Sequence, residues 1–122
     1  MKKVIPILLL LLTIPVFYGC KKKEPPCEIT LTITNVTSIS ATYEGNIPDC
    51  FEDDIAVRGV CWSTSKSPTI GEDSGTIEGY GTGTFTSSLF ELTPNTTYYI
   101  RAYAMNNEAT FYSAISQFKT LN

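Results

Sequence analysis

Apolar and polar side chains alternate along most of the chain, and this two-residue period limits the possible folds more than any other property of the sequence. Ile29, Leu31 and Ile33 alternate with threonines, and the same pattern returns around residues 39–47 and 98–105. Alternation is typical of a strand with one buried face, because successive side chains of a strand point to opposite faces. No stretch of the sequence shows a sustained helical period. We therefore expect an all-β domain.

Stretches rich in turn-forming residues separate the alternating runs. Residues 65–83 are rich in glycine, serine, threonine and proline, and Thr93-Pro94-Asn95 predicts a tight turn. Six strong candidate strands and one weak strand near residues 75–78 make about seven, at the spacing of a β-sandwich. The sequence has no internal repeat. Residues 27–122 are therefore expected to form one domain, a seven-stranded antiparallel β-sandwich.

One segment carries a more specific signal than the alternation. It reads Leu92-Thr93-Pro94-Asn95-Thr96-Thr97-Tyr98 and continues into an alternating apolar strand. This pattern resembles the corner before strand F of fibronectin type III domains, which have an immunoglobulin-like fold. The resemblance implies a tyrosine corner made by Leu92, Pro94 and Tyr98, with the Tyr98 ring turned inward and its hydroxyl bonded to upstream backbone. Turn carbonyls are the partners that we expect for this buried hydroxyl.

The resemblance extends over most of residues 27–120. Upstream, Arg58-Gly59-Val60-Cys61-Trp62-Ser63 is similar to a strand of the form of this fold found in secreted and surface proteins of Gram-negative bacteria. The last strand departs from the family pattern, because Ser116 stands where a core valine is expected. We therefore expect weaker packing at that edge. The fold alone does not indicate a function, since it serves adhesion, spacer and receptor roles alike.

Residues 1–19 have the character of an export leader. Lys2 and Lys3 precede an apolar stretch of 15 residues, shorter than the roughly 20 that a membrane-spanning helix needs. The stretch ends in Gly19-Cys20, which resembles the lipobox of bacterial lipoproteins. The resemblance implies cleavage after Gly19 and a lipid, including palmitate, on Cys20. An uncleaved anchor and an ordinary secretory leader are the alternatives.

Residues 20–26 are expected to form the lipidated cysteine and a tether to the domain. The tether reads Lys21-Lys22-Lys23-Glu24-Pro25-Pro26, and its charges and prolines predict a solvated, extended linker. Its lysines suit contact with anionic lipid headgroups, and a purely solubilising role is the alternative. The second mature residue is lysine, whereas aspartate there signals retention in the inner membrane of Gram-negative bacteria. We therefore expect an anchor in the outer membrane.

Charge is divided unevenly along the chain. Residues 27–122 hold 4 basic and 11 acidic side chains, a net charge of −7. An acidic domain disfavours nucleic acid, because phosphate backbones are bound mainly through lysine and arginine. The expected partners are therefore the membrane, through the N-terminal lipid, and an unidentified protein or glycan.

Three cysteines remain in the mature chain if Cys20 carries the lipid. In a fibronectin-like sandwich, the start of strand A and the loop after strand B share one end, so the resemblance favours a disulfide between Cys27 and Cys50. Cys61 lies beside Trp62 in a predicted strand, where a buried thiol packs as a small apolar group. A pairing that includes Cys61, and the absence of any disulfide, remain open.

The chain offers little for catalysis. It has no histidine, which is the most common general base and metal ligand, and its serines and Cys61 therefore lack an evident activating group. One loop holds an acidic cluster made by Asp49, Glu52, Asp53 and Asp54. A Ca²⁺ site and a solvated loop are the alternatives there, and the missing EF-hand pattern favours the solvated loop. We predict no metal site, no cofactor and no enzymatic activity.

A candidate binding face follows from the parity of the strand after the tyrosine corner. Tyr99, Arg101 and Tyr103 have the parity opposite to the corner tyrosine, so we expect them to point outward. The neighbouring strand adds Phe111 and Tyr112. Tyrosine and arginine are favoured at recognition surfaces, and planar rings also suit sugars. The alternative is that these side chains only cover the sheet as cross-strand pairs.

Together these features predict a non-catalytic, lipid-anchored protein of the cell envelope. Its fibronectin type III-like domain would serve in binding, in adhesion or as an accessory part of a surface complex. The alternative is a carbohydrate-binding surface protein that uses the exposed aromatic face and loop aromatics such as Phe51 and Tyr80. Soluble glycans would change tyrosine or tryptophan fluorescence in the second case and not in the first.

Overall fold

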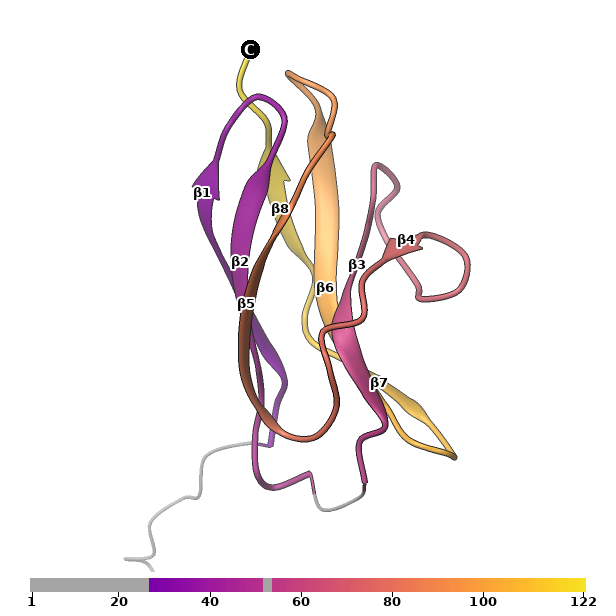
Figure 1. The fold of residues 1–122 in the computed structure, drawn as a ribbon. Helices are drawn as coiled ribbons and strands as arrows, with labels where there is room; N and C mark the ends of the chain where they lie inside the picture. Colours follow the sequence, from indigo (N-terminus) through magenta and orange to yellow (C-terminus); the bar gives the residue numbers. More distant parts are fainter. Residues whose placement is uncertain (1–26, 52–53) are drawn as a thin grey trace, which may run out of the picture.

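Two antiparallel β-sheets face each other in the computed structural model, which describes residues 27–51 and 54–122 (Figure 1). The described residues form eight strands. The prediction of an all-β sandwich is therefore confirmed. The predicted leader, Cys20 and the tether lie outside the described residues, as do Glu52 and Asp53 of the acidic cluster.

The first sheet has three strands in the order β1-β2-β5. These strands are β1 (Thr30–Val36), β2 (Ala41–Ile47) and β5 (Gly83–Leu89). The predicted alternation holds in β2, where Ala41, Tyr43 and Ile47 are fully buried. At Gly45 an added Cβ would lie 2.5 Å from the ring of Phe85 on the neighbouring strand. The glycine therefore makes room for an aromatic ring of the core.

The second sheet has five strands in the order β4-β3-β6-β7, and β8 also pairs with β6. These strands are β4 (Ser74–Gly75), β3 (Val57–Ser63), β6 (Thr97–Met105), β7 (Thr110–Tyr112) and β8 (Ser116–Lys119). The inward face of β6 carries Ile100, Ala102 and Ala104, which have no exposed surface. These side chains form the core together with buried residues of the first sheet.

The last predicted strand, residues 111–120, is divided in two, so the described residues form eight strands where we expected about seven. Ser113 lies buried between β7 and β8. Its amide donates to the carbonyl of Ala102 at 2.9 Å, and its hydroxyl accepts from the amide of Ala102 at 2.9 Å. The side chain thus supplies a hydrogen bond that the strand backbone would otherwise make, and the strand is interrupted there. Alternation does not reveal this, because serine also fits the polar positions of a regular strand.

The turn before β6 has the features implied for a tyrosine corner. Leu92 and Tyr98 are buried, and Pro94 lies exposed in the turn. The Tyr98 ring stacks against the ring of Phe118 on β8, with 5.6 Å between the ring centroids. This contact connects the turn to the last strand of the second sheet.

The partner of the Tyr98 hydroxyl differs from the expected carbonyl. It accepts a hydrogen bond from the amide of Thr93 at 2.9 Å. The turn carbonyls already have donors, because the Thr120 hydroxyl donates to the carbonyl of Thr93 and the Thr96 hydroxyl to that of Pro94. The backbone amide of Thr93 is therefore the group of this turn that pairs with the Tyr98 hydroxyl.

Replacing the phenol tests this corner. We expect Tyr98→Phe to lower the free energy of unfolding by about 1–2 kcal/mol, because the Thr93 amide loses its partner. Urea unfolding followed by Trp62 fluorescence would measure the change. Tyr99→Phe is the matched control, because it removes a hydroxyl from the opposite face of the same strand. If the two variants were equally stable, the hydrogen bond to Thr93 would not be what stabilises the corner.

Candidate functional site

The segment between β3 and β5 covers part of the outward face of β6. Side chains that we predicted to form an exposed binding face are therefore partly or fully buried. Tyr99, Arg101 and Tyr103 do share one face of β6. However, the Tyr103 side chain is only 1% exposed, and its hydroxyl donates to the carbonyl of Thr76 at 2.6 Å. Tyr103 therefore lies on the outward face of β6, as parity predicts, but it is buried there, and its prediction as part of an exposed binding face is wrong.

Gly59 gives the physical reason for this burial. It stands opposite Tyr103 in the register of β3 and β6, and an added Cβ would lie 2.2 Å from the carbonyl oxygen of Thr76. Because Gly59 has no side chain, the backbone at Thr76 can lie over β3 and accept from the phenol. A buried hydroxyl without such a partner would destabilise the fold. Burial also raises the pKa of Tyr103.

Arg101 and Tyr112 are half-buried and contact each other on the same face. The Arg101 guanidinium lies 3.8 Å from the centroid of the Tyr112 ring, and its Nε donates to the carbonyl of Pro68 at 2.9 Å. The Tyr112 hydroxyl accepts from the amide of Ile70 at 3.2 Å. Tyr112 also stands opposite Tyr103 in the strand register. These contacts favour the alternative in which the side chains cover the sheet.

Phe111 does not belong to this face. It stands opposite Ala104 in the register, so its ring lies on the inner side of the sheet, half-buried against the core. The ring packs edge-on against Phe51, with 5.2 Å between centroids. Phe111 and Tyr112 are neighbours on one strand and point to opposite faces, so they cannot form one binding surface.

Cys27 and Cys50 are joined by a disulfide, with 5.9 Å between their Cα atoms. The bond ties the start of the domain to the connection between β2 and β3. The Cys61 thiol is free and buried, and burial raises its pKa, which disfavours the nucleophilic thiolate. The structure therefore supports a packing role for Cys61 and places the disulfide at one end of the sandwich.

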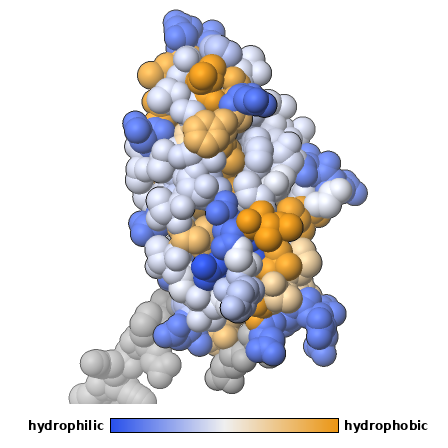
Figure 2. Space-filling view, viewed as in Figure 1, coloured by the Kyte–Doolittle hydropathy of each residue, from blue (hydrophilic) through white to orange (hydrophobic). Residues whose placement is uncertain are grey.

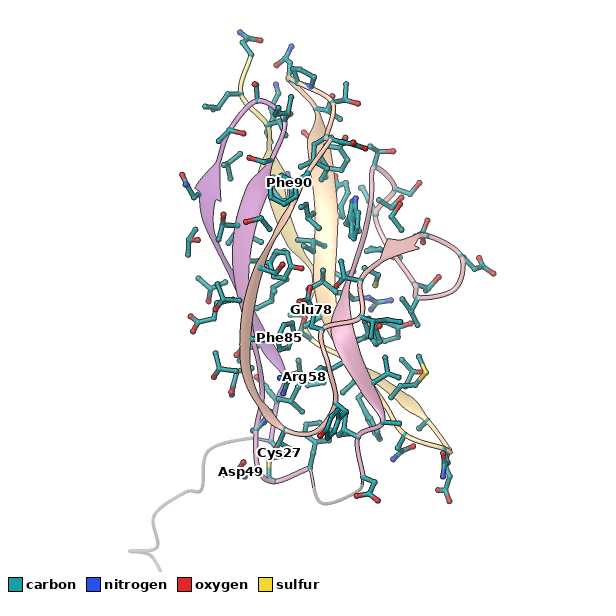
Figure 3. All side chains as sticks on the ribbon, in the orientation of Figure 1. Cys27, Asp49, Arg58, Glu78, Phe85 and Phe90 are labelled. Carbon is teal, nitrogen blue, oxygen red and sulfur yellow. A yellow bond between two sulfur atoms is a disulfide. The ribbon has the colours of Figure 1, made fainter. Side chains whose placement is uncertain are left out.

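Arg58 lies between the two sheets and holds the connection that leads into β5 (Figure 3). Its guanidinium is 5.2 Å from the centroid of the Phe85 ring on β5. One terminal nitrogen donates to the carbonyl of Thr82 at 2.8 Å and to that of Gly81 at 3.3 Å, and Nε donates to that of Glu78 at 3.3 Å. The path of residues 78–83 is therefore tied to one side chain.

The side chain of Glu78 also holds this connection in place. Its carboxylate accepts a hydrogen bond from the hydroxyl of Tyr43 on β2. Burial and this hydrogen bond raise the pKa of Tyr43 to about 12. The phenol therefore stays protonated over the physiological range and acts as a donor to Glu78.

The connection carries an exposed tyrosine beside a cleft. Tyr80 is 78% exposed, and the glycines on either side of it, Gly79 and Gly81, have φ values of 109° and 84°. The cleft measures about 770 Å³. We call it the loop cleft, and it is lined by Phe51, Asp54, Ile55, Ala56, Tyr80, Gly81, Thr82 and Asn107. The Thr82 hydroxyl donates to Asp49 at 3.3 Å, which places this cleft at the end of the sandwich that holds Cys27 and Cys50.

A second groove separates β1 from the divided strand β7–β8. It measures about 540 Å³ and is lined on one side by residues 27–31 and on the other mainly by residues 111–116. Ser113, Ala114 and Ser116 are the small side chains on that second side.

The chain ends at the opposite end of the sandwich (Figure 1), and large apolar side chains are exposed there as well (Figure 2). Phe90 is 70% exposed, Leu121 56% and Ile39 53%. The amide of Leu92 donates to the carbonyl of Ile39, and that of Leu121 to the carbonyl of Thr37, so connected turns carry these side chains. We call this region the distal end, because it lies away from Cys27 (Figure 3).

Metal-binding groups and membrane-spanning helices are both lacking in the described part of the chain. Within 27–51 and 54–122, no three cysteine, aspartate or glutamate side chains lie together as a metal-binding group. Over the same residues, no helix has the length and apolar character needed to span a membrane.

Solved structures similar to this chain include fibronectin type III domains. The sixth fibronectin type III domain of human fibronectin type III domain containing protein 3 is 21% identical, covers 84% of this chain and 92% of its own, and has a TM-score of 0.55. The sensor domain of the anti-sigma factor RsgI4 in Pseudobacteroides cellulosolvens is 18% identical, with coverages of 81% and 98% and a TM-score of 0.55. A protein described as "Myokine structure" is 15% identical, with coverages of 81% and 100% and a TM-score of 0.57.

No protein-family model matches the sequence, and no curated protein matches it. The structural likeness, at 15–21% identity, establishes the fold and not a function. The domain thus has the fold of fibronectin type III domains, an immunoglobulin-like β-sandwich.

The disulfide is tested by counting thiols. On the unfolded, unreduced mature protein we expect one reactive thiol, that of Cys61, and three reactive thiols would rule out the bridge. Because the bridge closes a loop of 23 residues, its loss in a Cys27→Ser/Cys50→Ser variant is expected to lower the free energy of unfolding by about 3 kcal/mol. Urea unfolding measures this, and a reductant should destabilise the wild type while leaving the double variant unchanged.

Proposed function

We propose that this chain is a lipid-anchored, non-catalytic protein of the Gram-negative cell envelope that binds a protein partner through its distal end. The observation that carries the proposal is the exposure of Ile39, Phe90 and Leu121 there, at 53%, 70% and 56%. Large apolar side chains gathered in the open on a small domain are typical of protein contacts. Phe90 is the aromatic anchor of this surface, a residue type enriched at the centre of interfaces.

The proposed anchor gives the distal end its orientation. A tether of six residues after Cys20 spans about 20 Å at ~3.1 Å per residue. The disulfide holds Cys27 at the end of the sandwich opposite Phe90. A lipid on Cys20 therefore keeps the Cys27 end close to the membrane and leaves the distal end open to a partner.

Two further observations support binding over catalysis. The chain has no histidine to act as a general base. One structural neighbour is the sensor domain of an anti-sigma factor, and nearly all of that domain aligns with this chain. In that protein the domain is named for sensing.

The predicted face on β6 has less support as a contact surface. Tyr103 is buried there, and Arg101 and Tyr112 are engaged with each other and with the segment that covers them. Freeing these side chains for a ligand would break contacts that stabilise the fold. We therefore place the partner contact at the distal end and not on this face.

The anchor is tested by metabolic labelling. Cells grown with labelled palmitate should incorporate the label into the wild-type chain, and Cys20→Ser should abolish the incorporation while the chain is still produced. Fractionation of the same cells should place the labelled protein in the outer membrane. Equal labelling of the two chains, or a membrane-bound but unlabelled wild type, would contradict the proposed lipid.

The distal contact is tested by affinity capture from detergent-solubilised envelopes. We expect a discrete protein to be captured by the wild type and by Tyr80→Ala, and to be reduced about tenfold with Phe90→Ala. Both substitutions remove an exposed aromatic ring, one at each end of the sandwich, so each is the matched control for the other. Identical capture by all three chains would exclude the distal end as the contact.

A further inference from the structure

The exposure of Tyr80 is not explained by the packing of the sandwich. Its ring is 78% exposed, yet the backbone on both sides of it is held in place. The amide of Arg58 donates to the carbonyl of Gly79 at 3.1 Å, and the amide of Gly81 donates to the carbonyl of Ile55 at 2.8 Å. An aromatic ring presented on a rigid loop loses little conformational entropy on binding, which is the property of an anchor for a ligand.

Arg58 supports this loop but is not among the residues that line the loop cleft. The Arg58 guanidinium donates to the carbonyls of Glu78, Gly81 and Thr82 and lies over the ring of Phe85. Its Nε and one of its terminal nitrogens are thereby engaged with the protein backbone. Arg58 is therefore a positioning residue that shapes the loop, and it is not part of the cleft lining.

The loop cleft combines aromatic walls with a few polar groups. Tyr80 and Phe51 are its aromatic residues, and Asp54 and Thr82 are polar residues in its lining. Ile55 also lines the cleft, but its side chain is 4% exposed and belongs to the core. Asn107 from the turn after β6 adds a carboxamide that both donates and accepts hydrogen bonds. The cleft volume of about 770 Å³ is within the range of about 300–1,000 Å³ for small-ligand sites.

These groups match the chemistry of a sugar. A pyranose ring presents a face of C–H bonds that packs on an aromatic ring, and its hydroxyls donate to carboxylate or amide oxygens and accept from amide N–H groups. Among the described residues, neither lysine nor arginine lines the cleft, and residues 27–122 carry a net charge of −7. A negatively charged ligand would therefore be repelled.

We propose that the loop cleft is a binding site for neutral glycans, with the Tyr80 ring as the stacking platform and Asp54 and Asn107 as hydrogen-bonding groups. This rests on the proposed function only in treating the domain as a binding module. The proposed glycan site lies at the end of the sandwich that is opposite to the proposed protein contact. A lipid-anchored chain with both sites would hold a glycan near the membrane and a protein partner farther out.

The test is glycan binding by the purified mature protein in a polyoxyethylene detergent, which contains no sugar. The probes are neutral oligosaccharides based on glucose, mannose, galactose, xylose and N-acetylglucosamine, printed as an array, with alginate fragments as the anionic comparison. We expect binding to at least one neutral probe and none to alginate. Tyr80→Ala should weaken that binding at least about tenfold, and Tyr80→Trp should retain it because a ring for stacking remains.

Phe90→Ala is the matched control, since it removes an equally exposed ring from the distal end and should leave glycan binding unchanged. Three results would overturn the proposal: the wild type binds none of the neutral oligosaccharides, it binds only alginate, or the wild type and Tyr80→Ala bind the neutral probe equally well. Urea unfolding of Tyr80→Ala should match the wild type, so that weak binding is not caused by a lost fold. Because Phe90→Ala should lose protein capture and keep glycan binding, failure of this proposal is distinguishable from failure of the protein contact.

Discussion

The half-buried guanidinium of Arg58 joins the two sheets, and the path of the chain between them depends on it. Arg58 belongs to β3 of the second sheet, and it lies over Phe85 of β5 in the first. A cation that is moved out of water destabilises a fold unless its donors are paired. Backbone carbonyls of residues 78–82 supply that pairing only when the connection into β5 takes the observed route. The same constraint therefore sets the start of β5 and the position of Tyr80.

A second constraint acts on the outer face of the second sheet. Gly59 allows the backbone of Thr76 to lie over β3, and the Tyr103 hydroxyl then finds its partner there. The covering segment also meets Arg101 through the carbonyl of Pro68. A face that would otherwise be solvent-exposed becomes a small second packing layer. Within residues 27–51 and 54–122, the aromatic side chains with the most exposed surface, Tyr80 and Phe90, lie toward the two ends of the sandwich and not on this face.

Local patterns predicted much of this arrangement. The inward positions of β2 and β6 follow from alternation, since each strand has a period of two. The buried tyrosine of the corner follows from the residues around Tyr98, although its partner is an amide because other side chains already bind the carbonyls. The break at Ser113 could not be predicted, since its hydroxyl replaces a backbone hydrogen bond only in the folded sheet.

The class of fold, the inward side of most strands and the chemical character of the N-terminal leader are all encoded locally in the amino-acid sequence. These properties depend on residues close together in the chain, where parity and composition act directly. Only the folded chain shows that Tyr103 is buried, that Phe111 packs against Phe51 while Tyr112 packs against Arg101, and that Phe51 and Tyr80 line one cleft. Each of these depends on contacts between segments distant in the sequence. Parity tells which side chains share a face, but only the packing of distant segments determines whether that face meets water.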